Sequence, residues 1–157
     1  MTVARRTLGN TGIQVSSLGL GTVKFGRNQE VKYPSSFTLP VDRTIEDLLA
    51  LAQELGINLL DTAPAYGSSE QRIGRLLRNR ENWVLCTKVG EEFTTGKSFF
   101  DFGAEHTRRS VERSLRDMRT DVLDIVLIHS DGDDLRILER TDCLPTLLKM
   151  RDKGLIK

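Results

Sequence analysis

The chain has 157 residues, the length of one ordinary domain, and 38% of them are hydrophobic, a fraction that excludes global disorder. Its 23 Lys and Arg against 22 Asp and Glu leave a formal net charge of +1, so bulk charge gives no reason to expect a nucleic-acid partner. No apolar run reaches the ~20 residues that span a bilayer, and the amino terminus lacks the apolar core of a secretory signal. We therefore predict a single soluble, cytoplasmic domain with no membrane partner.

Two cysteines, Cys86 and Cys143, lie far apart in the sequence. They form no C-x-x-C pair, and neither has a His or Cys neighbour at metal-ligand spacing. This pattern predicts two buried free thiols in a reducing compartment and no metal site.

The first elements are short. Residues 3–16 place an Asn-Thr-Gly turn between two segments that can pair, which is typical of a β-hairpin. The glycine-flanked apolar run 17–22 (SLGLGT) predicts a buried strand. The polar stretch 23–42 contains two prolines and no clear periodicity, so we expect a long loop that is functional or mobile.

Helical spacing begins at Asp42, the expected N-cap, and stops before Gly56. Strand and helix patterns then alternate, with a long loop before the third helix and an acidic loop before the fourth. Strand 57–61 is followed by a helix that is capped by Ser68 or Ser69 and bears Ile73, Leu76 and Leu77. Strand 83–88 is followed by a helix with Val111, Leu115 and Met118. Strand 124–129 is followed by a helix with Leu144, Leu147 and Leu148. Residues 155–157 read as the start of another strand.

Such alternation is typical of a parallel sheet with helices on its faces. Four strand–helix units are present, whereas a complete barrel of eight units takes about 250 residues. Two α/β architectures therefore stay open at this point: an open doubly wound sheet of modest size, or the N-terminal half of a barrel.

Three consecutive strands end on ionisable side chains: Asp61, Lys88 and His129. Because the loops after parallel strands all open at one edge of the sheet, these groups are expected to converge there. Taken singly, each has an ordinary interpretation: a helix-capping acid, a solvated lysine and a satisfied histidine at a strand end. Their coincidence on three consecutive strands favours a functional site.

Tyr66 follows Asp61 by five residues on the same expected rim, where it either covers the sheet end or takes part in chemistry. A phenol, with an ordinary pKa of about 10, is a poor proton donor at neutral pH unless a cation favours its ionised form. Lys88 is the candidate for that cation, held in place by Asp61. His129 would then hydrogen-bond to a carbonyl oxygen undergoing reduction.

Three other motifs give weaker indications of function. The Gly-Leu-Gly at 19–21 begins like a dinucleotide fingerprint, but Lys24 stands in place of the third glycine and a loop follows. The acidic run 131–134 does not match a calcium loop. The arginine-rich helix around 108–119 is interpreted as a charged outer face, and His106 near its start as exposed and without a partner.

Several of these segments resemble the aldo-keto reductase family. The resemblance rests on RRTLGNTGIQVSSLGLGT (5–22), GINLLDTAPAYGSSEQRIG (56–74), Lys88 in VLCTKVG, and LIHSD (127–131). It implies a TIM (β/α)8 barrel with an N-terminal hairpin closing the bottom, and an oxidoreductase that reduces small aldehydes and ketones with NADPH.

Carried over by position, the resemblance implies roles for individual residues. Tyr66 would be the proton donor, Lys88 and Asp61 the pair that makes the phenol more acidic, and His129 the group that orients the substrate carbonyl. Gly21 and Thr22, together with Asp61, would line the nicotinamide end of NADPH/NADP.

Relatives bind the rest of the cofactor largely with the second half of the barrel. We therefore expect residues 1–157 to be the N-terminal portion of one barrel domain, with the hairpin at about 3–16 and the strand–helix units over about 17–157, and expect the missing half-barrel or self-association to cover the open sheet. Two alternatives stay open: a non-catalytic cofactor-sensing subunit with the reductase fold, and an inactive truncated fragment.

Overall fold

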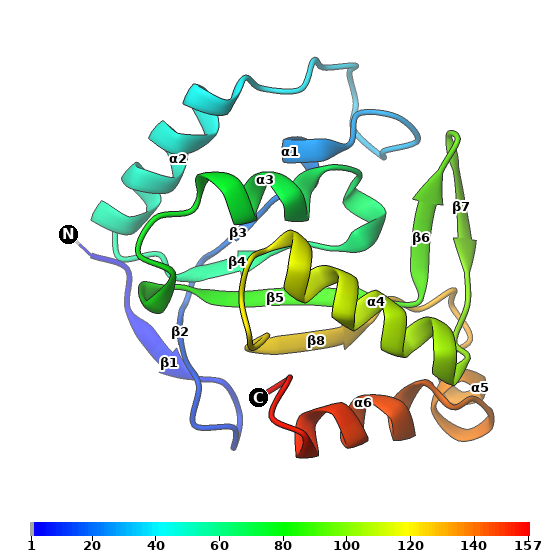
Figure 1. Cartoon of the computed structure of the whole chain (residues 1–157). Helices are drawn as coiled ribbons and strands as arrows, with labels where there is room; N and C mark the ends of the chain where they lie inside the picture. Colours follow the sequence, from blue (N-terminus) through cyan, green and yellow to red (C-terminus); the bar gives the residue numbers. More distant parts are fainter. Residues whose placement is uncertain (1) are drawn as a thin grey trace.

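The computed structural model describes residues 2–157 (Figure 1). Its first element is the predicted antiparallel hairpin of β1 (Arg5–Thr7) and β2 (Gln14–Ser16). Asn58, which precedes the second strand of the main sheet, accepts a hydrogen bond from the Ser16 amide at 2.6 Å and donates to the Gln14 carbonyl at 2.9 Å. The hairpin is thereby fixed at the amino-terminal end of the sheet.

The main sheet has four parallel strands in sequential order. These are β3 (Gly19–Gly21), β4 (Leu59–Asp61), β5 (Val84–Val89) and β8 (Ile125–Ile128). Leu123, just before β8, bridges Ile156 in parallel, so residues 155–157 begin a further strand beside β8 as the sequence predicts. Within residues 2–157, β3 and β8 are the edge strands of this sheet.

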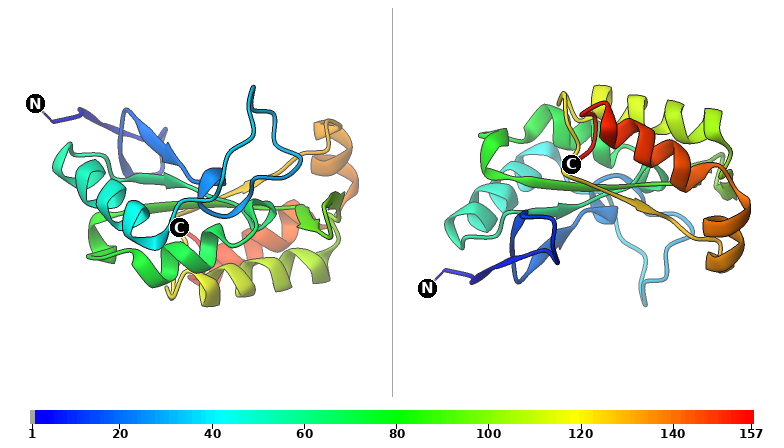
Figure 2. Two further views of the ribbon diagram at one scale, coloured as in Figure 1. Left: turned by 90° about the horizontal axis from the view of Figure 1, so that it is seen from above. Right: turned by 90° about the horizontal axis from the view of Figure 1, so that it is seen from below.

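Helices connect the strands. They are α1 (Val23–Gly26), α2 (Asp42–Glu54), α3 (Ser69–Leu76), α4 (Ala104–Asp117), α5 (Asp134–Arg140) and α6 (Cys143–Asp152), with the 3-10 turns η1 (Pro64–Tyr66) and η2 (Arg80–Asn82). In both views of Figure 2, α3, α4 and α6 lie on one side of the sheet, opposite the hairpin and the loop after α1. A doubly wound fold covers both faces with helices and reverses its strand order. The helices on one side and the sequential strands therefore identify four consecutive units of a (β/α)8 barrel.

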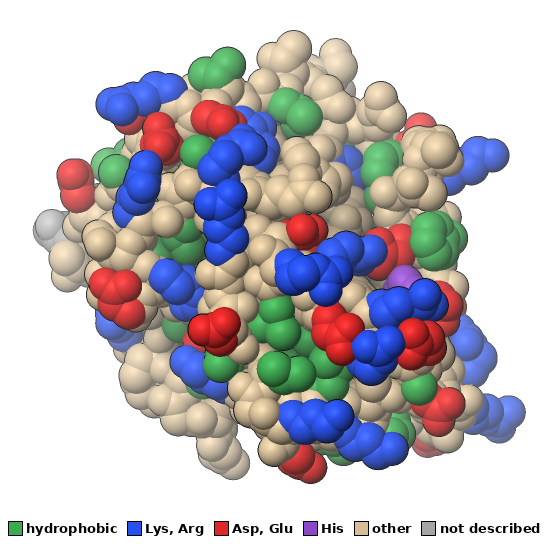
Figure 3. Space-filling view, viewed as in Figure 1, with side chains coloured by type: hydrophobic (Ala, Val, Ile, Leu, Met, Phe, Trp, Pro, Cys, Tyr) green, Lys and Arg blue, Asp and Glu red, His purple; other side chains and the backbone are tan. Residues whose placement is uncertain are grey.

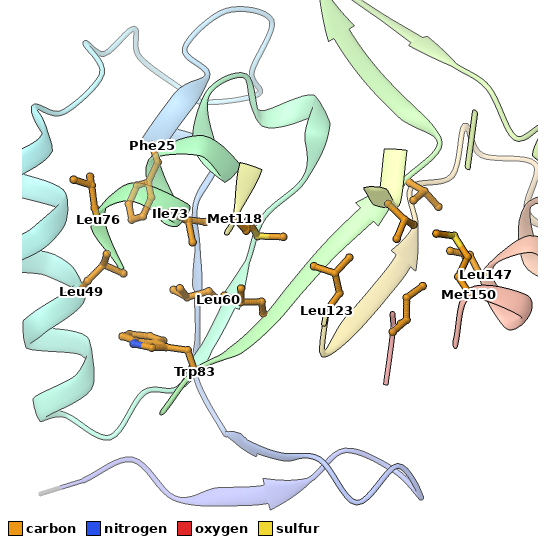
Figure 4. Close-up of a cluster of buried hydrophobic side chains, with 14 of the residues drawn as sticks. Phe25, Leu49, Leu60, Ile73, Leu76, Trp83, Met118, Leu123, Leu147 and Met150 are labelled. Atoms are coloured by element: carbon orange, nitrogen blue, oxygen red, sulfur yellow. The ribbon is translucent and has the colours of Figure 1, made fainter. Parts of the chain in front are cut away.

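The hydrophobic core lies between the sheet and these helices (Figure 4). Leu60 and Leu85 face it from the strands and are fully buried, and Ile73 of α3 and Met150 of α6 pack against it. Burial of apolar surface of this kind is worth about 25 cal/mol per Å². Both cysteines are buried free thiols, as predicted, and burial raises the pKa of Cys86 to about 11.

The expectation of an unstructured loop over residues 23–42 is wrong at its start. Residues 23–26 form the single turn α1, and Phe25 lies in the core, 3% exposed. Arg72 of α3 donates to the carbonyls of Phe25 at 2.7 Å and Pro40 at 2.6 Å. One side chain thus holds both ends of the segment, a long-range contact that local periodicity does not contain.

Asp42 is not the cap of α2. Val41 occupies the N-cap position, and Asp42 is the first helical residue. Its carboxylate accepts hydrogen bonds from Arg72 at 2.7 Å and Arg75 at 2.6 Å, which tie α2 to α3. These guanidinium groups hold the pKa of Asp42 below its ordinary value.

Two expected loops contain further elements. The loop after β5 forms an antiparallel hairpin of β6 (Glu91–Thr94) and β7 (Lys97–Phe100), turned at Thr95-Gly96, both with positive φ. The acidic loop after β8 contains α5, where Asp133 accepts a hydrogen bond from the Arg136 amide. The hairpin residues are mostly polar and give no hydrophobic period, while α5 carries Leu135, Ile137 and Leu138 but is only seven residues long, too short for a period to stand out.

His106 is not an exposed, isolated side chain. The β6–β7 hairpin folds over the start of α4, leaving the His106 side chain 17% exposed with Nε2 3.4 Å from Glu92 Oε1. The rest of α4 does carry a charged outer surface, with Arg108 paired to Glu105 and Glu112. Figure 3 shows charges of both signs interspersed over this face.

Among residues 2–157, the structure contains no helix with the length and apolar character needed to cross a bilayer.

Candidate active site

An ion pair joins two strands at the carboxyl-terminal edge of the sheet. Lys88 of β5 donates from Nζ to Asp61 Oδ1 of β4 at 2.7 Å and to the Thr62 carbonyl at 2.8 Å. Asp61 lies opposite Cys86 in the ladder, so Lys88, two residues further, projects from the same face. Burial lowers the pKa of Lys88, but the hydrogen bond and charge of Asp61, helped by Tyr66, outweigh it and raise that pKa above its ordinary value. The lysine is held as an ammonium.

Tyr66 is placed beside this ammonium by the η1 turn. Its ring centroid lies 4.8 Å from Lys88 Nζ. Gly67, which follows it, has φ +63° and lies so close to Gly26 that a Cβ there would come within 2.2 Å of the Gly26 carbonyl oxygen. Glycine is therefore required where the chain leaves the turn, and this close backbone contact fixes the position of Tyr66.

His129 follows β8, and its amide donates to the Val89 carbonyl at 2.8 Å. Its ring is perpendicular to that of Tyr66, with the centroids 6.2 Å apart. Burial is the main cause that lowers the pKa of His129, with Lys88 adding to it, while Glu91 opposes it. The neutral imidazole is thereby favoured around neutral pH.

The structure therefore brings Asp61, Tyr66, Lys88 and His129 together at one end of the sheet, as the strand-end pattern predicts. Their chemical roles stay predictions. Within residues 2–157, no group of three or more His, Cys, Asp or Glu side chains is arranged to hold a metal ion.

Gly21 and Thr22, the two neighbouring residues expected to line the nicotinamide, differ in solvent exposure. Gly21 lies opposite Asp61 in the ladder, is exposed, and would have open space around a Cβ. The rim at Gly21 is therefore bare beside the partly exposed carboxylate of Asp61. Thr22 is fully buried, and its hydroxyl donates to the Asp61 carbonyl at 2.9 Å while accepting from Ser69. The side chain of Thr22 thus supports the backbone of Asp61 from below the rim.

A cavity of about 470 Å³ opens beside the tyrosine and histidine, lined among others by Val23, Arg27, Tyr33, Tyr66, Glu91 and His129. The segment after β3 forms one wall. There, Lys24 Nζ lies 4.3 Å from the Tyr33 ring centroid and 4.8 Å from that of Phe37. The polar segment is thus ordered by cation–π contacts and borders the space where a substrate would lie.

Two residues near the site were not singled out in the sequence. Glu91 lies 3.0 Å from His129, and Arg27 lies 3.5 Å from Glu91. Glu91 comes three residues after Lys88, and this proximity to a strand end was the one available signal. Nothing in the sequence indicated Arg27.

A parallel half-barrel with an ion pair, a phenol and an imidazole at its carboxyl-terminal edge has the layout of a barrel protein whose functional site is built from the loops on that edge. The model of the aldo/keto reductase family matches residues 17–157. The chain belongs to the aldo/keto reductase family.

Solved structures agree with this assignment. A putative aldo-keto reductase from Pseudomonas aeruginosa superimposes with a TM-score of 0.89 at 59% identity, over 97% of this chain and 57% of that one. An aldo-keto reductase from Bacillus halodurans in its holo form gives a TM-score of 0.78 at 29% identity, over 98% of this chain and 48% of that one. The fold is therefore that of the aldo-keto reductase barrel.

Curated relatives include the L-galactose dehydrogenase of Arabidopsis thaliana, 34% identical over 95% of this chain and 45% of that protein. The D-arabinose 1-dehydrogenase of Saccharomyces cerevisiae is 35% identical over 75% of this chain and 36% of that protein. The chain spans less than half the length of these two relatives.

Proposed function

We propose that this chain forms the catalytic half of an oxidoreductase that reduces an aldehyde or ketone to an alcohol with NADPH, using Tyr66 as proton donor. The observation that carries the proposal is the Lys88 ammonium, fixed by Asp61 at 2.7 Å and lying 4.8 Å from the Tyr66 ring. This arrangement stabilises negative charge on the phenol oxygen when the proton leaves.

Each residue has a part in the proposed reaction. Gly21 and Asp61 would border the nicotinamide, and NADPH when bound supplies the hydride that adds to the carbonyl carbon. Tyr66 gives its phenolic proton to the carbonyl oxygen, so that one hydride and one proton convert the carbonyl to an alcohol. His129 in its protonated form donates a hydrogen bond to the same oxygen and orients it, while burial of Lys88 strengthens its field at the phenol.

The substrate class is a small carbonyl compound. Two relatives are named as dehydrogenases of the sugars L-galactose and D-arabinose. Polyhydroxylated carbonyl compounds, and the reverse oxidation of sugars, therefore belong in the first substrate panel beside simple aldehydes.

We further propose that a second half-barrel completes the molecule. Leu127 pairs with Lys88 in the ladder and so shares the inner face of the sheet, where it is 45% exposed. Edge strands and exposed apolar side chains of this kind are usually covered by another layer. Self-association of the chain would cover the same surfaces, and sedimentation of the chain alone distinguishes a monomer from a dimer.

The test compares the chain alone with a fusion, in which Lys157 is followed by the remaining carboxyl-terminal part of the Pseudomonas aeruginosa relative, 59% identical over the matched region. NADPH binding is followed by fluorescence quenching, and NADPH oxidation is followed with a reactive aromatic aldehyde. Turnover by the fusion that is lost with Tyr66→Phe supports the proposal. Binding without turnover indicates a cofactor-sensing subunit, and neither in a folded fusion indicates an inactive fragment.

A further inference from the structure

A partly buried carboxylate, Glu91, lies behind His129 and has no part in the proton transfer proposed above. Glu91 is the first residue of β6, immediately after Gly90, whose φ of +111° turns the chain out of β5. The hairpin that begins there contacts the η1 turn that carries Tyr66. Glu91 therefore reaches the active site from an element that is separate from the barrel strands.

Both carboxylate oxygens of Glu91 have polar neighbours. Oε2 lies 3.0 Å from His129 Nδ1, and Oε1 accepts a hydrogen bond from the Ser98 hydroxyl at 2.5 Å and lies 3.5 Å from Arg27 Nη1. Nδ1 is shielded from solvent and makes no hydrogen bond of standard geometry in the structure of residues 2–157, where Glu91 is the one acid within ion-pair distance of it. The carboxylate thus faces a single nitrogen of the catalytic-site imidazole.

Arg27 lies at ion-pair distance from this carboxylate and is itself fixed. Its guanidinium donates to three backbone carbonyls: Gln29 at 2.9 Å, Ala65 at 3.1 Å and Glu30 at 2.9 Å. It also stacks over the Phe93 ring, 3.7 Å from the centroid. A buried, multiply bonded arginine gives Glu91 little freedom to turn away from the imidazole.

A carboxylate beside Nδ1 favours the form of the ring in which Nδ1 carries a hydrogen. The substrate is then left with Nε2, on the other side of the ring. With the ring neutral, that nitrogen only accepts a hydrogen bond, as from an alcohol; with the ring protonated, it donates one, as to a carbonyl oxygen. The orientation and the protonation of His129 therefore both depend on the carboxylate.

We propose that Glu91 is a positioning residue, which fixes the His129 ring with hydrogen on Nδ1 and leaves Nε2 for the substrate oxygen. This rests on the proposed function for the identity of the substrate group, but the tautomer is a property of the chain alone. Other charged groups also face the ring: Lys88 and Arg27 oppose its protonation, and Asp61 favours it. The phenol ring of Tyr66 also faces the imidazole.

The chain contains two histidines, His129 and His106, so the ring nitrogens can be observed directly by long-range ¹H–¹⁵N NMR of the histidine-labelled full chain. We expect neutral His129 to carry its hydrogen on Nδ1. In Glu91→Gln, the titration midpoint of His129 falls because a favourable negative charge is lost. Hydrogen on Nε2 in the unsubstituted chain, or an unchanged titration in E91Q, would overturn the proposal.

Glu92→Gln is the matched control, because it removes the same charge from the next residue of β6. Glu92 pairs instead with Arg113 and lies near His106. E92Q is expected to leave the titration of His129 in place. An equal change at His129 in both variants would show a non-specific charge effect and overturn the proposal. If E91Q does not fold, the tautomer in the unsubstituted chain decides the question alone.

The catalytic consequence is measured in the fusion. E91Q is expected to lower kcat for aldehyde reduction about 10- to 100-fold, by analogy with the loss seen when the hydrogen-bond partners of metal-ligating histidines are removed. The KM for NADPH stays unchanged, and the pH limb that needs protonated His129 moves to lower pH. E92Q should retain kcat. A fusion without reductase activity would refute the proposed function, while the NMR result on Glu91 would still stand or fall by itself.

Discussion

Lys88 and Asp61 form an ion pair across β4 and β5, 2.7 Å from Nζ to Oδ1, in which the lysine side chain is 10% exposed and the aspartate 38% exposed. The buried member depends on its partner more than the exposed one does, because an ammonium without a counter-charge is costly in a low-dielectric site. The pair thus ties the stability of the barrel half to the group that we place beside Tyr66.

Asp61→Asn should destabilise the chain. The raised pKa of Lys88 means that its favourable charged form contributes to stability at neutral pH, and this contribution is lost only as the pH rises above about 10.5 through the folded pKa. Because Asp61 is partly exposed, we expect a loss of about 1–3 kcal/mol at pH 7 by urea denaturation. Asp47→Asn, which breaks an exposed pair with Arg43, is the control and should change stability by less than about 0.5 kcal/mol. Equal stability of the two variants would contradict the argument.

Tyr66→Phe in the fusion should lower carbonyl reduction roughly 100- to 10,000-fold while leaving NADPH binding nearly unchanged, because the ring stays and the proton donor is lost. Tyr33→Phe, at the only other tyrosine in the sequence, removes a hydroxyl from the same cavity and should retain most turnover. Steady-state kinetics and fluorescence quenching separate the two effects. Undiminished turnover in Y66F would remove Tyr66 from the proposed role.

Gly21→Ala should weaken cofactor binding, whereas Gly26→Ala should lower the stability of the fold. A Cβ at Gly21 meets open space, so G21A should fold with stability within about 0.5 kcal/mol of the parent and bind NADPH less tightly, since the methyl group occupies the bare rim. A Cβ at Gly26 would lie 2.3 Å from the Ser69 amide nitrogen and 2.4 Å from the Tyr66 carbonyl oxygen, so G26A must displace backbone and lose stability. Thermal unfolding and cofactor titration of both variants test this contrast. Tight NADPH binding by G21A would argue against the nicotinamide contact.

Glu70 gives a pH dependence that is independent of the active site. Burial behind β5 raises its pKa to about 7 from 4.5, although Thr87 donates a hydrogen bond to it. The folded state therefore binds a proton that the unfolded state releases, and the stability due to Glu70 falls as the pH rises from 4.5 to about 7. The full change is about 3 kcal/mol. Glu70→Gln should abolish this slope in urea titrations between pH 5 and 8, whereas the exposed Glu112→Gln should keep it. A slope that survives in E70Q would rule out this carboxyl as its source.

Local sequence patterns predict much of this fold. The runs that became β4, β5 and β8 are short and apolar, and helical spacing follows each, because strands and helices bury side chains with different local periods. From parallel strands it follows that Asp61, Lys88 and His129 share one edge. The choice between a barrel and a doubly wound sheet was not local, because it depends on which side of the sheet each helix lies.

Tertiary structure decided what polar residues do. The β6–β7 hairpin, the partial burial of His106 and the Arg72 contacts that close the segment after α1 leave no hydrophobic period in the sequence. Glu91 contacts Arg27, which lies 64 residues before it in the chain, and His129, which lies 38 residues after it. The sequence by itself determined the order of the strands and helices and which residues stand at the strand ends. Long-range contacts decided which polar side chains are held around those residues. The reason is that a buried charge is stable only where folding supplies its partners.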